Sequence, residues 1–254
     1  MLAFFFIFVY HTGMTTYQLD SKTTSGWQRI SKPAQIAERR LIEGIVEGVF
    51  PIDSHLPGER ELAEALGVTR PTLRETLQRL ERDGWVEINQ GKPTRVRDYW
   101  KEGSLGVLNT LSRYPDHLPE NFVENLLNVR LAMAPTYTAM AVENAPEDII
   151  QLLEGRHDLV NDPQAFSSFD WQVHHVLTLL SQNPVFVMIL NGFKDLYLHL
   201  APFYFLIPSA RRHSMHFYQD LSQASTGRDP NQARILTDMV MRESIIFWRQ
   251  VEFN

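Results

Sequence analysis

Residues 59–97 carry the pattern that most restricts how this chain folds. A short helix is expected from Glu59 to Leu66, with its apolar residues on one face and Gly67 directly after it. A second helix is expected from about Arg70 to Arg82, where Asp83-Gly84 ends it. The segments WVEIN and TRVRDY then alternate apolar and polar residues like two strands, and the polar turn QGKP joins them. The segment therefore predicts two helices and a hairpin packed as one unit.

Two helices joined by a glycine-containing turn and followed by a hairpin are the pattern of a winged helix-turn-helix. In this motif the second helix lies in the major groove of DNA, and its first residues contact the bases. Within GVTRPTLRE, Thr69 is placed to cap that helix, and Pro71 falls in its first turn, where a missing N–H costs little. The side chains expected to reach DNA from this turn are Arg70, Thr72 and Arg74.

The charge of this segment differs from that of the whole chain. All 254 residues together carry a formal net charge of −6, so any nucleic-acid site must be local. Between Thr69 and Arg97, seven basic residues against four acidic ones give a charge of +3. A solvated helix face with ordinary i,i+4 ion pairs is the alternative explanation. That alternative does not account for a cap, an arginine pair and a basic hairpin occurring together.

Residues 1–30 are expected to lie outside the fold, as a disordered or mis-annotated extension. The run MLAFFFIFVY is shorter than the ~20 apolar residues of a membrane-spanning helix and lacks the features of a secretion signal. A translation start at Met14, a disordered tail and a membrane anchor are the alternatives, and the anchor is the least favoured. The chain has no cysteine, which excludes disulfides and thiolate zinc sites and is compatible with the cytoplasm.

The remainder of the chain, residues 101–254, is predicted to be all-α, because helical periodicity dominates after Asp98. Proline-containing boundaries at 115–119, 145–146, 162–163, 183–184, 208 and 227–230 divide it into some six or seven helices of about 12 to 25 residues. Pro135 and Pro202 fall inside helical patterns, and each predicts a kink or a break. The expected fold is mainly α, with a winged helix-turn-helix domain at 31–100 and a helical bundle at 101–254.

The stretch LPGERELAEALGVTRPTLRETLQRLERDGWVEINQGKPTRV resembles the DNA-binding domain of the GntR family of bacterial regulators, especially its FadR-like, fatty-acid-responsive members. The similarity continues through NFVENLLNVR, FDWQ, SQNPVFVMILNGFKDLY and RESIIFW. The resemblance implies DNA contacts from a set that includes a wing tip in the minor groove: Arg60, Thr69, Arg70, Thr72, Arg74, Gln90 and Gly91. Pro71 and Gln90 depart from the family, which has a threonine and a histidine there, so the preferred operator is expected to differ.

The resemblance also implies that the helical domain binds long-chain acyl-CoA and that binding releases a homodimer from DNA. The positions that match the family's ligand pocket, or depart from it within the pocket, are Leu127, Arg130, His174, Tyr204, Met241, Ser244 and Trp248. Met241 replaces a glycine of the family pocket, and the basic residue that the family has after the tryptophan falls near Phe253. The resemblance is therefore weaker in the ligand pocket than in the DNA-binding domain. Plain core packing is the alternative explanation for any one of these residues.

Asp170 and His174 suggest a rival, because a related metal-binding branch uses an Asp-x-x-x-His pair with two further histidines. Two ligands do not make a stable site, and a buried or pocket-lining histidine is favoured, so no metal or cofactor is expected. The chain lacks a G-x-S-x-G elbow, a P-loop and a G-x-G-x-x-G motif, which argues against an enzyme. We therefore predict a cytoplasmic, homodimeric regulator that binds a near-palindromic operator and no membrane. A metal-assisted sensor of a small carboxylate, and a helical enzyme or docking protein, are the alternatives.

Overall fold

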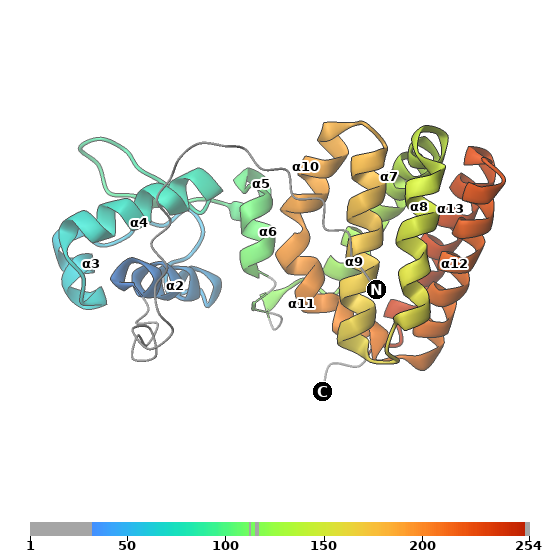
Figure 1. Cartoon of the computed structure of the whole chain (residues 1–254). Coiled ribbons are helices and arrows are strands. Elements are labelled where there is room, and N and C mark those ends of the chain that lie inside the picture. Colours follow the sequence, from blue (N-terminus) through green and yellow to red (C-terminus); the bar gives the residue numbers. More distant parts are fainter. Residues whose placement is uncertain (1–31, 112, 115–116, 252–254) are drawn as a thin grey trace, which may run out of the picture.

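The computed structural model describes residues 32–111, 113–114 and 117–251. It has two parts, a small N-terminal domain and a larger bundle of helices, which lie side by side along the long axis of the molecule (Figure 1). The mainly α fold predicted from the sequence is confirmed, with a winged helix-turn-helix followed by an all-α domain. The prediction for residues 1–30 lies outside the described residues. No helix among the described residues is long and apolar enough to cross a membrane.

The N-terminal domain packs three helices against a short hairpin. These elements are α2 (Pro33–Val46), α3 (Glu59–Leu66), α4 (Arg70–Asp83), β1 (Val86–Glu87) and β2 (Arg95–Val96). The leucine stripe of α4 is buried against α2, with Leu73 and Leu80 at 1% exposure or less. Gly67 adopts a left-handed conformation with φ of 69°, which ends α3 and turns the chain into α4. The apolar spacing in the sequence therefore decides which face of α4 remains outside.

The strands are shorter than the sequence predicted. They pair antiparallel, with Val86 opposite Val96 and Glu87 opposite Arg95. The expected second strand, TRVRDY, ends early because Asp98 precedes a short helix, α5 (Tyr99–Glu102). The chain leaves the hairpin at this point and enters α6 (Leu105–Leu111), which leads to the second domain.

The C-terminal domain is built from long helices packed side by side. They are α7 (Phe122–Asn144), α8 (Pro146–Glu154), a 3-10 turn (Gly155–Asp158), α9 (Pro163–Leu180), α10 (Pro184–Gly192), α11 (Lys194–Phe205), α12 (Pro208–Thr226) and α13 (Pro230–Trp248). Five of the predicted proline boundaries are borne out, because α8, α9, α10, α12 and α13 each begin at a proline, while the boundary at 115–119 lies partly outside the described residues. The pairing of α7 with α13 is the most extensive helix contact, and both helices contribute to the main core.

Of the kink or break predicted at Pro135 and at Pro202, the structure excludes the break. Neither Pro135 nor Pro202 breaks its helix, since α7 and α11 continue through them. Proline removes one backbone hydrogen bond, a loss that the packing of these helices offsets. The break occurs instead after Gly192, between α10 and α11. A Cβ at Gly192 would lie 2.6 Å from a methyl carbon of Leu105, so glycine is what allows α6 to approach this junction.

Helix α6 contributes to both domains rather than to the second alone. Val107 and Leu111 are buried in the N-terminal core. Leu108 packs instead beside Leu196 and Leu200 of α11. In Figure 1 this helix stands between the two domains. Helix α6 therefore connects the two domains, so that a displacement of one domain can be transmitted to the other.

Candidate DNA interface and ligand cavity

Helix α4 begins with the local geometry that its sequence predicts. Thr69 is the N-cap, and its hydroxyl oxygen accepts a hydrogen bond from the Thr72 N–H at 3.3 Å. The two threonine hydroxyls also lie 2.9 Å apart. Pro71 occupies the first turn and is exposed, where it has no intrahelical hydrogen bond to lose. The cap and the proline together fix where the helix starts and which side chains its first turn presents.

The arginines at this helix start are available to a partner to different degrees. Arg60 and Arg70 are exposed and form no hydrogen bond or ion pair within the part of the chain that the structure describes. Arg74 is also exposed, but its Nε lies 2.7 Å from Oε2 of Glu59, the first residue of α3. This ion pair joins the two helices of the motif and holds the Arg74 side chain in one place. The pair engages the Nε of Arg74 and leaves its two terminal nitrogens available to a partner.

The tip of the hairpin is open and polar. Gln90 and Gly91 are exposed, and the turn is closed by a 3.1 Å bond from the Lys92 N–H to the Asn89 carbonyl. Gly91 has φ of 73°, and no atom lies within 4 Å of the position of a Cβ. The backbone conformation, rather than crowding, therefore favours glycine here, and the turn leaves room for a close approach to a partner.

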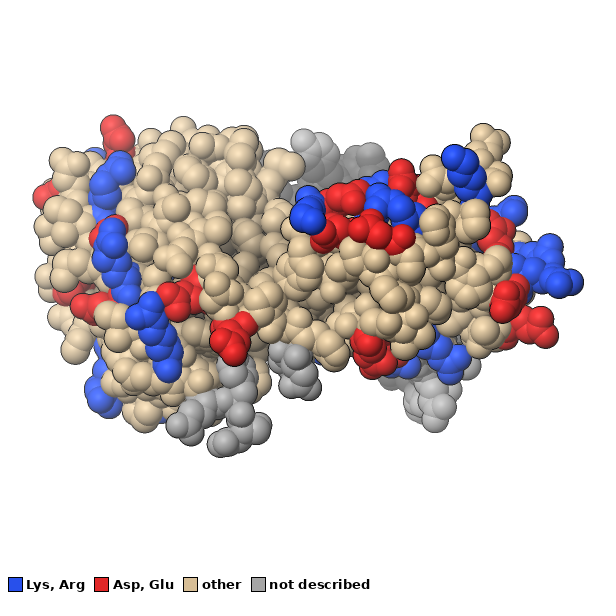
Figure 2. Space-filling model, turned by 180° about the vertical axis from the view of Figure 1, so that it is seen from behind, with Lys and Arg blue, Asp and Glu red and all other residues tan. Residues whose placement is uncertain are grey.

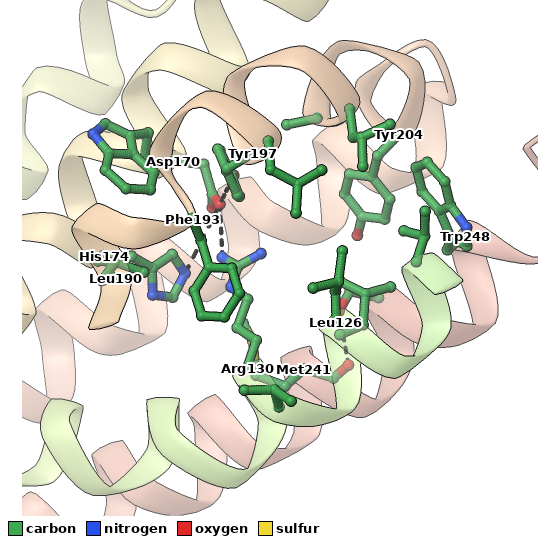
Figure 3. Close-up of a pocket in the computed structure, with 18 of the residues that line it drawn as sticks. Leu126, Arg130, Asp170, His174, Leu190, Phe193, Tyr197, Tyr204, Met241 and Trp248 are labelled. Carbon is green, nitrogen blue, oxygen red and sulfur yellow. Dashed lines mark hydrogen bonds and ion pairs between the residues drawn. The ribbon is translucent and has the colours of Figure 1, made fainter. Parts of the chain in front are cut away.

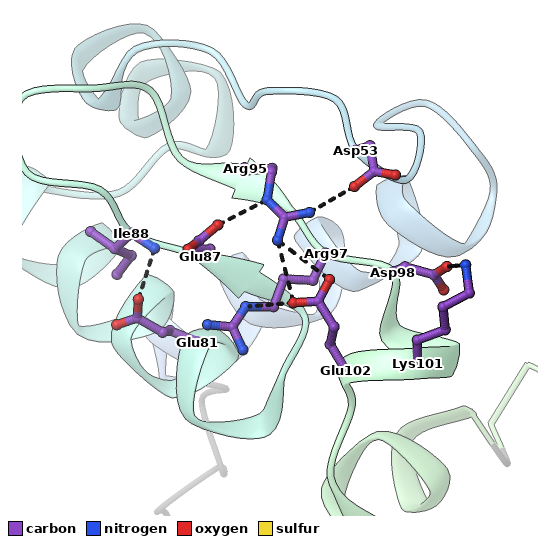
Figure 4. A network of polar contacts seen from close by, with 9 residues as sticks. All are labelled: Asp53, Glu81, Glu87, Ile88, Arg95, Arg97, Asp98, Lys101 and Glu102. Atoms are coloured by element: carbon purple, nitrogen blue, oxygen red, sulfur yellow. Dashed lines mark hydrogen bonds and ion pairs between the residues drawn. The ribbon is translucent and has the colours of Figure 1, made fainter.

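Part of the positive charge counted in the sequence is neutralised inside the domain (Figure 4). Arg95 donates hydrogen bonds to Asp53 at 2.6 Å and to Glu87 at 2.8 Å, and it also pairs with Glu102. The hydrogen bond from Arg95 lowers the pKa of Glu87. Arg97 lies 3.8 Å from Glu102. These contacts tie the hairpin to α5 and to the loop before α3, so they orient the wing.

Glu81 of α4 makes a further contact with the hairpin, because its carboxylate accepts a 2.7 Å hydrogen bond from the Ile88 N–H. In the view of Figure 2, basic and acidic side chains lie next to one another on this domain, both on the part nearest the bundle and at its far end. Among the residues that the structure describes, Arg70, Arg82 and Lys92 are the basic residues of the 69–97 segment that form no ion pair. The charge that remains free for a nucleic acid is therefore smaller than the sequence count suggested.

The helical domain encloses a cavity of about 120 Å³. Its wall is mostly aliphatic and aromatic and comes from α7, α9, α10, α11, α12 and α13 (Figure 3). All the ligand-pocket residues expected from the sequence lie on this wall: Leu127, Arg130, His174, Tyr204, Met241, Ser244 and Trp248. Their convergence on one cavity is a geometric fact, and ligand binding by them remains a proposal.

One end of the cavity is polar, and Asp170 is at its centre. The Asp170 carboxylate accepts hydrogen bonds from Arg130 at 2.8 Å, from Tyr218 at 2.7 Å, and from the Tyr197 hydroxyl. The Arg130 guanidinium also lies over the ring of Tyr197. Burial alone would raise the pKa of the Asp170 carboxyl, but the positive charge of Arg130 lowers it to about 2. Arg130 and Asp170 thus form a buried ion pair, surrounded by the apolar residues of the cavity wall.

His174 completes the polar end. Its Nδ1 lies 2.8 Å from the Tyr137 hydroxyl, and its ring is stacked on Phe217. Burial, together with the nearby charge of Arg130, lowers the pKa of His174 to about 3, so the imidazole is neutral at physiological pH. Its Nε2 has no hydrogen-bond partner among the residues that the structure describes.

The metal alternative raised by Asp170 and His174 does not fit this donor set. His174 Nε2 lies 3.8 Å from the Asp170 carboxylate, but that carboxylate is engaged by a guanidinium and two phenols. Within the described residues, no group of three histidine, aspartate or glutamate side chains is arranged to hold a metal ion. His213 of α12, a histidine of the same domain, lies 2.9 Å from Glu243. The arrangement is that of a buried polar network.

Sequence reasoning missed the tyrosines of this network. Tyr137 and Tyr218 looked like core residues, and nothing in their spacing pointed to Asp170. The position of Tyr197 on the cavity wall could have been predicted from the sequence. Phe193, the residue before α11, recurs at helical intervals with Tyr197 and Tyr204, and all three line the cavity.

Comparison with known proteins places both parts of the chain. Residues 33–96 match the family model of the bacterial regulatory proteins of the gntR family, and residues 97–254 match the FadR C-terminal domain. The chain is 41% identical over 220 residues to the fatty acid metabolism regulator protein of Shewanella pealeana, which covers 86% of this chain and 92% of that protein. It is 42% identical over 200 residues to the protein of the same name from Shewanella denitrificans, covering 78% and 82%.

A solved structure shares the fold. It is that of Lar, which controls the expression of the Listeria monocytogenes agr system, with a TM-score of 0.54 at 17% identity, covering 89% of this chain and all of that one. A winged helix-turn-helix joined to such a helical domain defines a bacterial transcription regulator. The chain belongs to the GntR family of bacterial regulatory proteins and carries the FadR C-terminal domain. The prediction that it is not an enzyme is confirmed by this membership.

Proposed function

We propose that the protein is a cytoplasmic homodimer that regulates genes of fatty-acid metabolism and leaves its operator when long-chain acyl-CoA binds in the helical domain. The observation that carries this proposal is the combination of two sites in one chain. An exposed, capped helix start presents Arg70 and Thr72 in one domain, and a largely apolar cavity lies in the other. The names of relatives at about 40% identity support the fatty-acid assignment.

The DNA site is proposed to use the residues expected from the sequence. Arg60, Arg70, Thr72 and Arg74 would contact bases and phosphates of the major groove, and Gln90 and Gly91 would enter the minor groove. Thr69 contributes by capping α4. Because two identical subunits related by a two-fold axis recognise two equivalent half-sites, the operator is proposed to be near-palindromic.

The effector site is proposed to be the cavity. An acyl chain suits its aliphatic and aromatic wall, and the polar end around Asp170 marks where a polar group of the ligand would lie. Arg130, His174, Tyr204 and Ser244 are the polar side chains proposed to orient it. Leu127, Met241 and Trp248 are proposed to contact the chain.

Three measurements test the proposal. Selection from random DNA duplexes should yield a near-palindromic site, and size-exclusion chromatography with light scattering should show a dimer. Long-chain acyl-CoA titrated into a complex with fluorescently labelled operator should lower the anisotropy to that of free DNA, whereas CoA alone should not. A complex that stays intact at saturating acyl-CoA would refute the effector assignment and leave the DNA-binding assignment standing.

A further inference from the structure

The cavity contains a buried donor that the protein itself does not satisfy. His174 is 2% exposed and lies on the cavity wall, and its Nε2 has no hydrogen-bond partner among the residues that the structure describes. The other ring nitrogen is engaged by the Tyr137 hydroxyl at 2.8 Å. In Figure 3 the imidazole lies at the same end of the cavity as Arg130 and Asp170, away from Trp248. An unpaired polar atom in such a place costs free energy unless a ligand or solvent pairs with it.

The surroundings of His174 decide which nitrogen carries the proton. The Tyr137 hydroxyl lies 2.8 Å from Nδ1 of His174 and can donate its phenolic proton to that nitrogen. The neutral imidazole then bears its proton on Nε2. The Asp170 carboxylate, 3.8 Å from Nε2, favours the same tautomer.

The same surroundings select the chemistry of the partner. The charge of Arg130 is already paired with Asp170 at 2.8 Å, and His174 itself is neutral. Arg130 and Asp170 together carry no net charge, so this end of the cavity offers a ligand oxygen a hydrogen bond from Nε2–H rather than a free counter-ion. The site therefore takes an uncharged acceptor oxygen attached to an otherwise apolar ligand.

An acyl thioester brings one such oxygen into an apolar cavity. Its carbonyl is bonded directly to the hydrocarbon chain, so burying the chain takes that carbonyl out of water, whereas phosphates can remain in solvent. An unpaired buried carbonyl and an unpaired buried N–H each carry a desolvation penalty. Pairing them removes both penalties at once.

We propose that the Nε2–H of His174 donates a hydrogen bond to the acyl carbonyl oxygen of the effector, and that the Tyr137 hydroxyl holds His174 in the tautomer required. This inference rests on the proposed function, because it assumes that an acyl thioester enters the cavity. His174 is thereby the residue that distinguishes an acyl group from a plain alkyl group.

The test compares palmitoyl-CoA with hexadecyl-CoA, a thioether in which a methylene replaces the carbonyl. Isothermal titration calorimetry on the full-length protein should show the thioester binding about tenfold more tightly, as expected for one buried hydrogen bond. His174→Phe should bind the two ligands with nearly equal affinity. His199→Phe, an exposed histidine of α11 away from the cavity, should keep the preference of the parent protein.

Tyr137→Phe provides a second variant that keeps the imidazole. Removing the phenolic donor releases His174 to either tautomer, so the preference for the thioester should fall without disappearing. Nitrogen-15 NMR of the ligand-free protein should show the proton of His174 on Nε2. A proton on Nδ1, or an undiminished thioester preference in His174→Phe, would overturn the assignment.

The outcomes separate the inference from the proposed function. If the parent protein binds neither ligand, the acyl-CoA effector is refuted and the His174 role is refuted with it. If it binds both ligands equally well, the effector class stands and the role of His174 alone is overturned. Because each comparison is made between ligands on the same protein, a general loss of stability in a variant does not imitate the expected result.

Discussion

Asn109 of α6 holds the junction between α10 and α11, because its Nδ2 donates a 2.7 Å hydrogen bond to the carbonyl oxygen of Gly192. Its Oδ1 accepts a second hydrogen bond, of 3.2 Å, from the Leu196 N–H. Phe193 and Leu196 beside this junction both line the cavity. Val107, two residues before Asn109, is buried in the N-terminal core. The side chain of Asn109 therefore connects the wall of the cavity to the packing of the DNA-binding domain.

Replacing Asn109 with alanine should weaken the effect of the ligand on DNA binding. A ligand that displaces the α10–α11 junction would no longer move α6 through these two hydrogen bonds. We expect operator affinity without ligand to change little, while the coupling free energy between effector and DNA falls by about 1 kcal/mol or more. The measurement is a set of operator titrations at several fixed acyl-CoA concentrations.

Asn191→Ala is the matched control for that experiment. Asn191 is exposed and lies next to Gly192 in the sequence, but its side chain does not join the two domains through a hydrogen bond that the structure shows. Its effector response should match that of the parent protein. Equal coupling in Asn109→Ala and the parent protein would show that α6 does not transmit the signal through this residue.

The arginines at the start of α4 should contribute unequally to operator binding. Arg70→Ala should cost about 1–3 kcal/mol of specific affinity, as expected for a side chain that contacts bases or phosphates. Arg74→Ala should cost less, because the charge of Arg74 is already partly offset by Glu59, which lies 2.7 Å away. Fluorescence anisotropy with operator DNA measures both. Arg234→Ala is the control, because Arg234 is an exposed arginine of α13. If Arg70→Ala and Arg74→Ala lose no more operator affinity than Arg234→Ala, the start of α4 is not the DNA-binding site.

The helix starts were the part of the fold most accessible from the sequence. Proline at the first position and a capping residue before it are local requirements, so Asn183-Pro184 and Asp229-Pro230 could be placed without knowledge of the packing. The break after Gly192 could not be placed in this way. It depends on the approach of Leu105 from a distant part of the chain, which a local pattern does not contain. Arg95 likewise looked free in the sequence, because its partner Asp53 is 42 residues away and its partner Glu102 lies on a short helix, α5, in place of the expected end of the second strand.

Stability should fall on mild acidification because of His174. The folded protein binds a proton on His174 only near pH 3, whereas the unfolded chain does so near the ordinary value of 6.5. The folded-state pKa is the lower one, so the stabilisation is present above pH 6.5 and is lost as the pH falls toward 3. Between pH 7 and pH 5 this single group removes about 2 kcal/mol from the free energy of unfolding.

Urea unfolding at pH 7 and pH 5 measures this loss. Between these two pH values, the free energy of unfolding of His174→Phe should fall by about 2 kcal/mol less than that of the parent protein. The Asp170 carboxyl acts in a separate window, because its pKa is lowered from 3.8 to about 2 and its contribution is lost only below pH 4. An identical pH dependence in His174→Phe and the parent protein would contradict a neutral, buried imidazole.

The ligand residues could be brought together from the sequence only by resemblance to a family. Leu127 and Trp248 lie at opposite ends of the C-terminal domain in the sequence, and their meeting depends on the pairing of α7 with α13. Periodicity showed that each helix has an apolar face, but it did not distinguish a face that fills the core from one that lines a cavity. Met241 belongs to both, since it is part of the main core and of the cavity wall.

Met241 should therefore set the size of ligand that the cavity accepts. Met241→Ala removes a side chain that is 3% exposed, so we expect a loss of about 2–3 kcal/mol of stability together with a larger cavity. Affinities for a series of acyl-CoA ligands of increasing chain length should shift in favour of the longer ones. Met239→Ala is the matched control, because Met239 is 52% exposed on the same helix and should change neither quantity by much. If both variants keep the chain-length preference of the parent protein, Met241 does not limit the ligand.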